Sequence, residues 1–258
     1  MSGTQLTVAF DIGNTRTKCA LIEADGIRMA FSALTEPTET LAARLEVARQ
    51  ETGASLPAKA RCVVSSVHPA ADDAVRRFWT STSGGPAEFF GADLPVPISL
   101  EVEEPEKAGT DRVLCALGGR ELADAPCIVV MAGTAITVDL VDGAGRFAGG
   151  AIAPGFSLCA RAMHEGAACL PLIQPRRPAQ ALGRNTIEAL QSGVYHFCHG
   201  GVVALIEQLA GVCGNYPQVV VTGGDAELLV PLDIRREVRH VPALVFEGMR
   251  AALKQSEV

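Results

Sequence analysis

Basic clusters and long apolar runs are both missing from this sequence. Its 258 residues carry 22 Lys and Arg against 29 Asp and Glu, which gives a net charge of −7. An acidic chain without a basic block is a poor ligand for nucleic acid or for an anionic membrane surface. Apolar runs of about 20 residues, the length that spans a bilayer, do not occur either. We therefore expect the protein to bind neither nucleic acid nor a membrane.

Paired cysteine motifs and a secretion signal are missing as well. The eight cysteines are scattered without C-x-x-C spacing, and most of them lie in apolar runs. Residues 1–5 carry no basic side chain of the kind that begins a signal peptide. Cysteines in this distribution are typical of buried thiols in a reducing compartment. The sequence therefore predicts a cytoplasmic protein.

The chain does contain the apolar residues of a globular fold. Hydrophobic residues make up 48% of the composition and charged residues 20%, as in soluble proteins with a sizeable core. A chain of 258 residues is long enough for one large domain or for two of ordinary size. Strands come first and then alternate with helices in the predicted order of elements, so we expect an α/β fold with a mixed sheet.

One segment near the N-terminus has the features of a phosphate-binding turn. The apolar run 6–10 predicts a buried strand that leads to Asp11, and Gly13 follows it. Glycine lets the backbone approach a ligand, successive backbone N–H groups bind an anion, and a carboxylate beside them can hold Mg²⁺. The chain then continues as a strand over 16–23 that carries Lys18, so the glycine lies in a β-hairpin. An ordinary hairpin turn is the alternative interpretation.

The second half of the chain repeats this order of elements. A strand over 126–130, a turn at Gly133-Thr134 and a strand over 136–141 follow one another as in the first hairpin. Such an internal duplication predicts two related α/β domains that face one ligand, each with a glycine hairpin. We place the domains at 1–108 and 109–258.

A long helix and a glycine pair complete the second half. We expect the helix over 185–209, broken at one of its glycines. The strand 218–222 is followed by Gly223-Gly224. A glycine pair after a strand allows a flat ring to lie against the backbone, which suits the adenine or the ribose of a nucleotide. Its position after two phosphate hairpins strengthens that interpretation.

This order of elements resembles the actin, Hsp70 and sugar-kinase superfamily, and within it the chain resembles the type III pantothenate kinases over nearly its whole length. Two of the shared motifs are specific to that family, namely Gly109-Thr110-Asp111-Arg112 and Gly149-Gly150-Ala151-Ile152-Ala153-Pro154-Gly155. The other shared segments are Asp11-Ile12-Gly13-Asn14-Thr15 with Lys18, Val64-Ser65-Ser66-Val67, Gly133-Thr134-Ala135 through Asp139, Leu170-Pro171, Gly183-Arg184-Asn185-Thr186, Gln191-Ser192-Gly193 and Thr222-Gly223-Gly224-Asp225. The resemblance implies two duplicated ribonuclease-H-like (actin-like ATPase) domains with mixed sheets that face a nucleotide cleft.

The resemblance also implies a function and the residues that carry it. The family uses ATP and Mg²⁺ to phosphorylate pantothenate to 4'-phosphopantothenate, the first step of coenzyme A synthesis. Asp111 is implied as the base that accepts the hydroxyl proton, and Asp11 as the residue that helps to hold Mg²⁺. The implied ATP-binding residues are Asp11, Ile12, Gly13, Asn14, Thr15, Arg16, Thr17, Lys18, Gly133, Thr134, Gly223 and Gly224. The implied substrate-binding residues are Gly109, Thr110, Asp111, Arg112 and Thr186, of which Arg112 suits the carboxylate of pantothenate.

Two positions depart from the family pattern. Met131 replaces an aspartate at a K⁺ site beside the phosphates, and a thioether does not hold K⁺ as a carboxylate does. Val102 replaces a tyrosine of the acidic loop. A non-catalytic regulatory relative and a kinase for another small hydroxyl substrate are therefore alternative interpretations, although the retention of Asp11, Lys18 and Asp111 favours an active enzyme. The resemblance further implies a homodimer with its substrate pocket near the interface.

Overall fold

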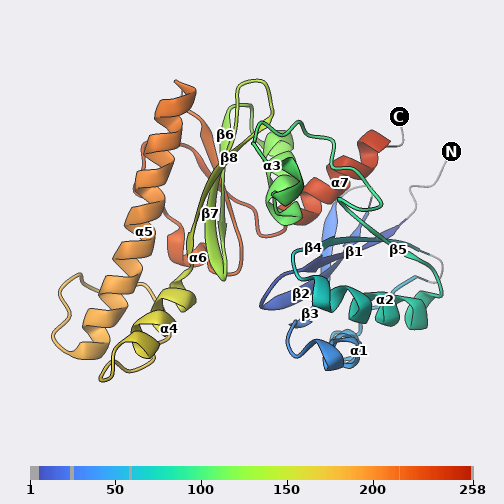
Figure 1. Ribbon diagram of the computed structural model, residues 1–258, viewed down its shortest axis with the longest axis horizontal. Helices are drawn as coiled ribbons and strands as arrows, with labels where there is room; N and C mark the ends of the chain where they lie inside the picture. The colour runs from blue at the N-terminus through green and yellow to red at the C-terminus, as the bar shows by residue number, and fades with distance from the viewer. Residues whose placement is uncertain (1–5, 24–25, 58–59, 215, 257–258) are drawn as a thin grey trace. The chain divides into compact units, whose positions relative to one another are not determined.

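The structure is a computed structural model that describes residues 6–23, 26–57, 60–214 and 216–256 (Figure 1). The chain forms two compact units. The first comprises Met1–Ile98, Glu106–Gly118 and Ala243–Val258, and the second comprises Ser99–Pro105 and Gly119–Pro242. Each unit is built around one five-stranded sheet.

The first unit holds a mixed sheet with the strand order β3-β2-β1-β4-β5. β1 lies at its centre, antiparallel to β2 and parallel to β4. The strands are β1 (Thr7–Ile12), β2 (Arg16–Ile22), β3 (Ile27–Leu34), β4 (Arg61–Ser66) and β5 (Ala87–Phe89). The helical segments that begin in this unit are η1 (Thr38–Thr40), α1 (Leu41–Glu51), α2 (Pro69–Ser83), α3 (Thr110–Leu122) and α7 (Leu244–Ser256). The short helix η2 (Pro105–Lys107) begins at Pro105, the last residue of a segment of the second unit, and ends in the first unit.

The second unit repeats this sheet with the order β10-β9-β6-β7-β8. Its central strand β6 is antiparallel to β7 and parallel to β9. The strands are β6 (Cys127–Ala132), β7 (Ala135–Val141), β8 (Phe147–Pro154), β9 (Gln218–Thr222) and β10 (Val238–His240), and the helices are α4 (Phe156–Gly166), α5 (Thr186–Cys213) and α6 (Ala226–Leu229). Because the two sheets have the same connections and the same strand directions, the predicted duplication of α/β domains with mixed sheets is confirmed.

The compact units differ from the predicted division at residue 108 in three segments. Residues 109–118, the first turns of α3, belong to the first unit, and so does α7 at the end of the chain. Residues 99–105 belong instead to the second unit, where the backbone N–H of Glu101 bonds to the carbonyl of Phe147. The division into 1–108 and 109–258 stays a prediction about the limits of the duplicated halves.

Aromatic packing fixes one face of the first sheet. Phe10, Phe31 and Phe78 contact one another edge to face with ring centroids 5.9–6.4 Å apart. Phe78 belongs to α2, and the three rings pack in one apolar cluster with buried residues of α1 and α2, which cover the same face of the sheet (Figure 1). Helix α7 packs against β1 and β2. Side chains alternate along a strand, so Asp11, the neighbour of Phe10, points to the face opposite this aromatic cluster.

Helices α3 and α7 of the first unit cross with their backbones in contact. A Cβ atom on Gly248 would lie 1.9 Å from the carbonyl oxygen of Leu114, and one on Gly118 would lie 2.8 Å from that of Leu244. No side chain larger than hydrogen fits at either position. The crossing therefore fixes the start of α3, and with it Asp111, relative to α7 and the sheet that α7 covers.

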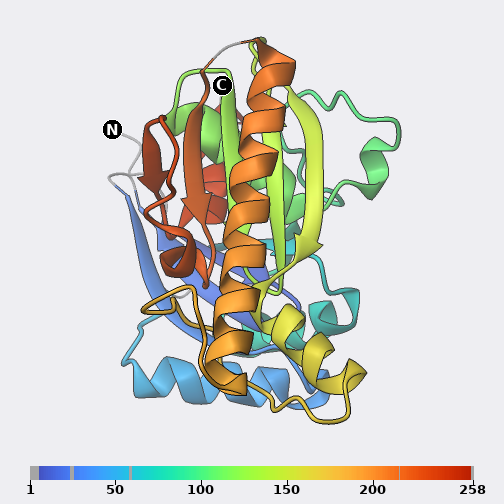
Figure 2. The same cartoon turned by 90° about the vertical axis from the view of Figure 1, so that its left-hand side faces the viewer.

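Helix α5 runs without a break along one face of the second sheet (Figure 2). The predicted break at a glycine is wrong. A Cβ atom at Gly193, Gly200 or Gly201 would meet nothing within 4 Å, so these glycines lie on the open side of the helix. The opposite side buries a stripe that includes Val194 and Cys198, and this packing outweighs the roughly 1 kcal/mol that each glycine costs. Within the described residues, no helix meets the length and apolarity that a membrane span requires.

Candidate active site

The first glycine hairpin joins β1 to β2 and is braced by a threonine from a distant part of the chain. The backbone N–H of Gly13 bonds to the carbonyl of Arg16 over 3.1 Å and closes the turn. Thr35 then donates its hydroxyl to the carbonyl of Gly13 over 2.7 Å, and its own N–H bonds to the carbonyl of Thr15. The buried hydroxyl of Thr17 lies 3.1 Å from that of Thr35. The turn is therefore held in one shape before any ligand binds.

The predicted ATP-binding residues of this hairpin point in different directions. The side chains of Ile12 and Thr17 are fully buried, so these two residues can offer a ligand only their backbone. Asn14, Thr15 and Arg16 form the exposed tip, and the guanidinium of Arg16 donates to the Ser32 hydroxyl over 2.8 Å. Among the polar residues predicted here, Asn14 and Thr15 are exposed at the tip.

Three charged residues meet beside this hairpin. Asp11 pairs in register with Lys18 on β2, and Asp111 lies at the start of α3. Burial raises the pKa of Asp11 to about 6, Lys18 lowers it, and the negative charge of Asp111 raises it further. Two carboxylates and an ammonium group are thus close enough to influence one another, although Asp11 and Asp111 are 100 positions apart in the sequence. The structure brings together the predicted catalytic residue and the predicted Mg²⁺ residue.

The start of α3 gives Asp111 a defined orientation. The carboxylate oxygen Oδ1 of Asp111 accepts the backbone N–H of Arg112 over 2.8 Å, and the N–H of Val113 bonds to the carbonyl of Gly109. A Cβ atom on Gly109 would lie 2.8 Å from the same Oδ1, so any larger residue at position 109 would push the carboxylate aside. The Gly109-Thr110-Asp111-Arg112 motif is therefore a structural unit that sets the position of one carboxylate.

The second glycine hairpin joins β6 to β7 and is enclosed by two other glycines. The N–H of Gly155 bonds to the carbonyl of Thr134 over 3.0 Å, and a Cβ atom on Gly155 would lie 2.0 Å from the carbonyl oxygen of Gly133. A Cβ atom on Gly223 would lie 2.1 Å from the carbonyl oxygen of Ala132. Three predicted segments, around residues 133, 155 and 223, thus meet at this turn.

The glycine pair after β9 has two separate structural explanations. Gly223 has φ +104°, a conformation that other residues rarely adopt, and it packs on the end of β6. Gly224 is exposed, with nothing within 4 Å of the place of a Cβ atom. The backbone at Gly224 is therefore open to a flat ligand, whereas Gly223 is already required by contact within the protein.

The two hairpins carry different side chains at equivalent positions. On the central strand, the place that Asp11 occupies in β1 belongs to Met131 in β6. Met131 is flanked in register by Thr137 and Thr222, where Asp11 is flanked by Lys18 and by a serine of β4. The first hairpin is thus charged and the second is neutral at its centre.

Thr186, the last predicted substrate residue, lies at the first turn of α5 in the second unit. Asn185 caps this helix, since its side chain accepts the N–H of Glu188 over 3.0 Å, and the Glu188 carboxylate accepts the N–H of Arg184 over 2.9 Å. Such a reciprocal cap fixes the first turn. Thr186 is exposed there, and its side chain is free to contact a molecule outside this unit.

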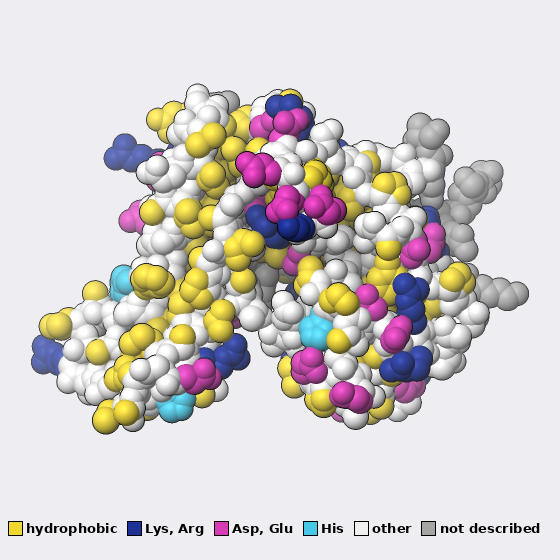
Figure 3. All heavy atoms as spheres, viewed as in Figure 1, with side chains coloured by type: hydrophobic (Ala, Val, Ile, Leu, Met, Phe, Trp, Pro, Cys, Tyr) yellow, Lys and Arg dark blue, Asp and Glu magenta, His cyan; other side chains and the backbone are white. Residues whose placement is uncertain are grey.

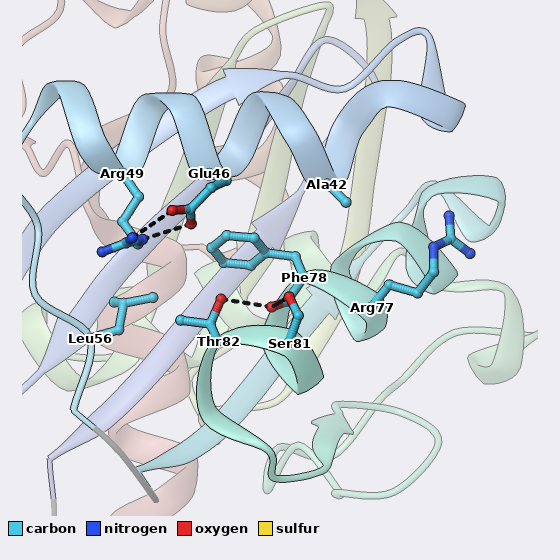
Figure 4. A pocket seen from close by; sticks show the side chains of 8 residues that line it. All are labelled: Ala42, Glu46, Arg49, Leu56, Arg77, Phe78, Ser81 and Thr82. Carbon is cyan, nitrogen blue, oxygen red and sulfur yellow. Dashed lines mark hydrogen bonds and ion pairs between the residues drawn. The ribbon is translucent and has the colours of Figure 1, made fainter.

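A cavity of about 670 Å³ lies between α1 and α2 of the first unit (Figure 4). Arg49 faces it, but both guanidinium donors that point inward bind the carboxylate of Glu46, at 2.6 and 2.8 Å. Phe78 also lines the cavity and packs on Phe10, so the cavity lies on the face of the sheet away from Asp11. The cavity is therefore separate from the charged cluster.

Sequence reasoning missed Thr35, which the hairpin needs. It lies 18 residues after Thr17 and just beyond β3, in a segment without glycine or a recognisable motif. Hydrogen bonds to the hairpin arise only once β3 is paired with β2. Nothing in the local sequence distinguishes Thr35 from an ordinary surface threonine.

Comparison with known proteins identifies the family. Residues 7–208 match the family model described as type III pantothenate kinase. The chain belongs to this family. A type III pantothenate kinase of Gluconobacter oxydans (strain 621H) is 36% identical over 248 residues, which cover 95% of this chain and 92% of that protein. The prediction of a kinase of the type III pantothenate kinase family is confirmed.

Solved structures of other proteins share the fold of this chain. A Campylobacter jejuni protein described as a Baf family transcriptional activator has a TM-score of 0.62 at 18% identity. The matched region covers 97% of this chain and 98% of that protein. MreB 5 of Spiroplasma citri has a TM-score of 0.51 at 10% identity, and the matched region covers 98% of this chain and 97% of that protein. At such identities the likeness concerns the fold alone, and it confirms the predicted actin-like ATPase class.

The charge on Asp11 should make stability depend on pH. The pKa of Asp11 is about 6 in the folded protein and 3.8 as the ordinary value, so the folded state binds this proton more tightly than the unfolded state. The free energy of unfolding therefore falls as the pH rises from about 4 to about 6. The side chain of Asp11→Asn does not ionise, so its free energy of unfolding does not fall in this way. Near pH 7.5 the variant should be more stable than the wild type by about 1–3 kcal/mol.

Urea denaturation of both proteins between about pH 4 and pH 7.5 measures this difference. The gain should shrink toward pH 4, where the wild-type carboxyl is protonated in the folded state and about half protonated in the unfolded state. Asp124→Asn, which changes an exposed carboxylate, is the matched control and should show no such trend. Equal stability of Asp11→Asn and the wild type near pH 7.5 would contradict the raised pKa.

Proposed function

We propose that Asp11, Lys18 and Asp111 carry out the ATP-dependent phosphorylation of pantothenate for which the family is named. The observation that supports these roles is the meeting of the three charges beside a preformed glycine hairpin in one unit. Phosphoryl transfer depends on positioning and on stabilisation of charge, and it needs little covalent help from the protein. A phosphate cradle, a cation and one aligned carboxylate are sufficient for it.

Asp111 is the base in this proposal. Its Oδ1 accepts the N–H of Arg112 over 2.8 Å, which fixes the carboxylate at the start of α3, and in this proposal the carboxylate orients the hydroxyl of the substrate. An ordinary carboxylate is a weak base for an alcohol, so Asp111 takes the proton late, when the new bond to phosphorus is largely formed. In the same proposal, Arg112 binds the carboxylate of pantothenate. Gly109, Thr110 and Thr186 are the other residues proposed to contact pantothenate.

Asp11 fits the requirements of a Mg²⁺ ligand. Mg²⁺ keeps several of its waters and is held by one or two carboxylates, and the described residues contain no cluster of three or more possible metal ligands. Bound Mg²⁺ supplies positive charge against the phosphates. Lys18 adds a further positive charge, and Gly13, Asn14 and Thr15 offer donors to the phosphate oxygens.

The second hairpin holds the rest of ATP in this proposal. Gly133 and Thr134 contact phosphate, and the open backbone at Gly224 lies against the adenosine. MreB 5 of Spiroplasma citri, which shares the fold, was solved with AMPPNP bound, which supports ATP as the nucleotide. We also propose a cytoplasmic enzyme, since five of its eight cysteines are buried thiols.

Replacement of the base should separate chemistry from binding. Asp111→Asn keeps the shape of the side chain but cannot accept the proton, so kcat should fall by about 10²–10⁴-fold. The Kd for ATP should stay within a small factor of the wild type. A coupled assay of ADP release with pantothenate, together with calorimetry of ATP binding, measures both quantities. If the wild type supplied with ATP, Mg²⁺ and pantothenate formed no phosphopantothenate, the regulatory alternative would replace this proposal.

The replacement of aspartate by Met131 should weaken the response to K⁺. A carboxylate beside the triphosphate adds negative charge that a bound K⁺ must offset. Met131 with its neighbours Thr137 and Thr222 is neutral, so the phosphates can bind there without the ion. Turnover should change by less than about twofold when K⁺ replaces a bulky organic cation at constant ionic strength.

Restoring the carboxylate provides the converse test. Met131→Asp should make turnover depend on K⁺, and Met131→Asn, which has nearly the same shape without the charge, is the control. Strong K⁺ dependence of the wild type would show that other oxygens supply the site and that Met131 is only tolerated.

We propose that a second copy of the chain covers the outer face of α4 and α5. Apolar side chains gather over these helices on the surface (Figure 3). Phe197 is 70% exposed, Ile187 50%, Met163 44% and Leu158 37%. An apolar face of this kind is typical of a protein interface. Thr186, the neighbour of Ile187, would then lie near the subunit contact, as the family resemblance implies for the substrate pocket.

A charge within this face should weaken the dimer. Phe197→Asp would bury an unpaired carboxylate in the interface, so the dimer dissociation constant should rise by at least about 10-fold. Sedimentation velocity over a range of concentrations measures it. Val47→Asp, which changes a side chain that is 53% exposed on α1, is the control. A dimer of unchanged affinity in Phe197→Asp would place the interface elsewhere.

A further inference from the structure

Ser65 on β4 is a buried polar residue with no partner in the protein. Its side chain is 0% exposed, and its hydroxyl makes no hydrogen bond to any described residue. A buried hydroxyl without a hydrogen bond costs about 1–3 kcal/mol. Nearly all such groups in native proteins are paired, so this exception needs an explanation.

The position of Ser65 suggests what its partner is. Ser65 is the in-register neighbour of Asp11 across the parallel pair β1 and β4, so both side chains point to the same face of the sheet. Lys18 flanks Asp11 from the other side. Neighbouring strands of a sheet lie about 4.7–4.9 Å apart, which is the separation between these two in-register residues. The unpaired hydroxyl is therefore one side chain away from the carboxylate proposed to hold Mg²⁺.

The next serine shows what an ordinary structural role looks like. Ser66 donates its hydroxyl to the carboxylate of Asp72 over 2.5 Å and accepts the backbone N–H of His68 over 3.2 Å. These bonds tie β4 to the start of α2. Ser66 is satisfied within the protein, whereas Ser65 is not, so the two serines of the Val64-Ser65-Ser66-Val67 motif have different functions.

The second unit has a hydroxyl at the equivalent position. Thr222 on β9 is the in-register neighbour of Met131 and is 4% exposed. Both sheets thus place a short hydroxyl side chain beside the residue that precedes the glycine hairpin. A purely apolar residue would pack at either position without the cost of a buried hydroxyl.

We propose that Ser65 is a positioning residue of the cation site and that its hydroxyl bonds to a water molecule on the cation that Asp11 holds. The inference rests on the proposed role of Asp11. Mg²⁺ retains most of its waters, and each such water needs an acceptor in the protein. A serine hydroxyl can accept this hydrogen bond without adding a third negative charge beside Asp11 and Asp111. The site is then matched to a hydrated divalent ion rather than to a bare one.

Binding of Mn²⁺, a spectroscopic substitute for Mg²⁺, tests this directly. Paramagnetic resonance in the presence of a non-hydrolysable ATP analogue gives the Kd of the ion. Ser65→Ala should raise this Kd about 10-fold, as is usual when a partner of a metal-bound group is lost. Its thermal stability should be equal to or above that of the wild type, because an unpaired hydroxyl is removed. ATP affinity without a divalent ion should not change.

Three further variants make the result decisive. Ser65→Thr keeps the hydroxyl and should bind Mn²⁺ more tightly than Ser65→Ala. Ser66→Ala is the matched control, and it should lose stability through the broken bond to Asp72 but keep the affinity for Mn²⁺. Asp11→Asn should lose Mn²⁺ binding. If Asp11→Asn bound Mn²⁺ normally, the proposed cation role would fail, whereas normal binding by Ser65→Ala alone would overturn only the role of Ser65.

Discussion

The backbone contact between α3 and α7 is the constraint on which the proposed catalytic arrangement depends. At Gly248 a Cβ atom would lie 1.9 Å from the carbonyl oxygen of Leu114, so the two helices can cross this closely only because glycine is present. Helix α7 packs in turn against β1 and β2, the strands of the first hairpin. Asp111 at the start of α3 is thereby held near Asp11, and neither residue depends on a loop for its position.

The duplicated halves have diverged in charge while the sheet topology has stayed the same. The first hairpin carries Asp11 and Lys18 and is braced by side-chain hydrogen bonds from Thr35. The second hairpin has the neutral Met131 at the equivalent place and is enclosed by backbone contacts at glycines. Backbone donors alone suffice to bind phosphate. Charge that must be placed accurately is therefore concentrated in one half, where a rigid sheet can hold it.

The sequence predicts what is local and misses what is made by tertiary packing. The hairpin around Gly13 was predictable because it is local, and its short turn sets the register that places Asp11 beside Lys18. The brace from Thr35 could not be predicted, since it forms only after β3 joins the sheet. Gly193 and Gly200-Gly201 were the alternative places for a break in α5, but the buried stripe on the opposite side of the helix outweighs their low helix propensity. Gly223 was assigned to the nucleotide alone, although contact with β6 already requires glycine there.

Asp11 and Asp111 are close enough to repel one another, and in the proposed function this repulsion favours a bound cation. Burial and the charge of Asp111 keep the pKa of Asp11 near 6, so a proton and a cation compete for the same group. A divalent ion removes the repulsion between Asp11 and Asp111, and the free energy released contributes to its binding. The same repulsion is consistent with the proposal that a hydroxyl, that of Ser65, lies beside the two carboxylates. Ser65 can orient a water on the ion, whereas a further carboxylate would bind a proton instead of strengthening the site.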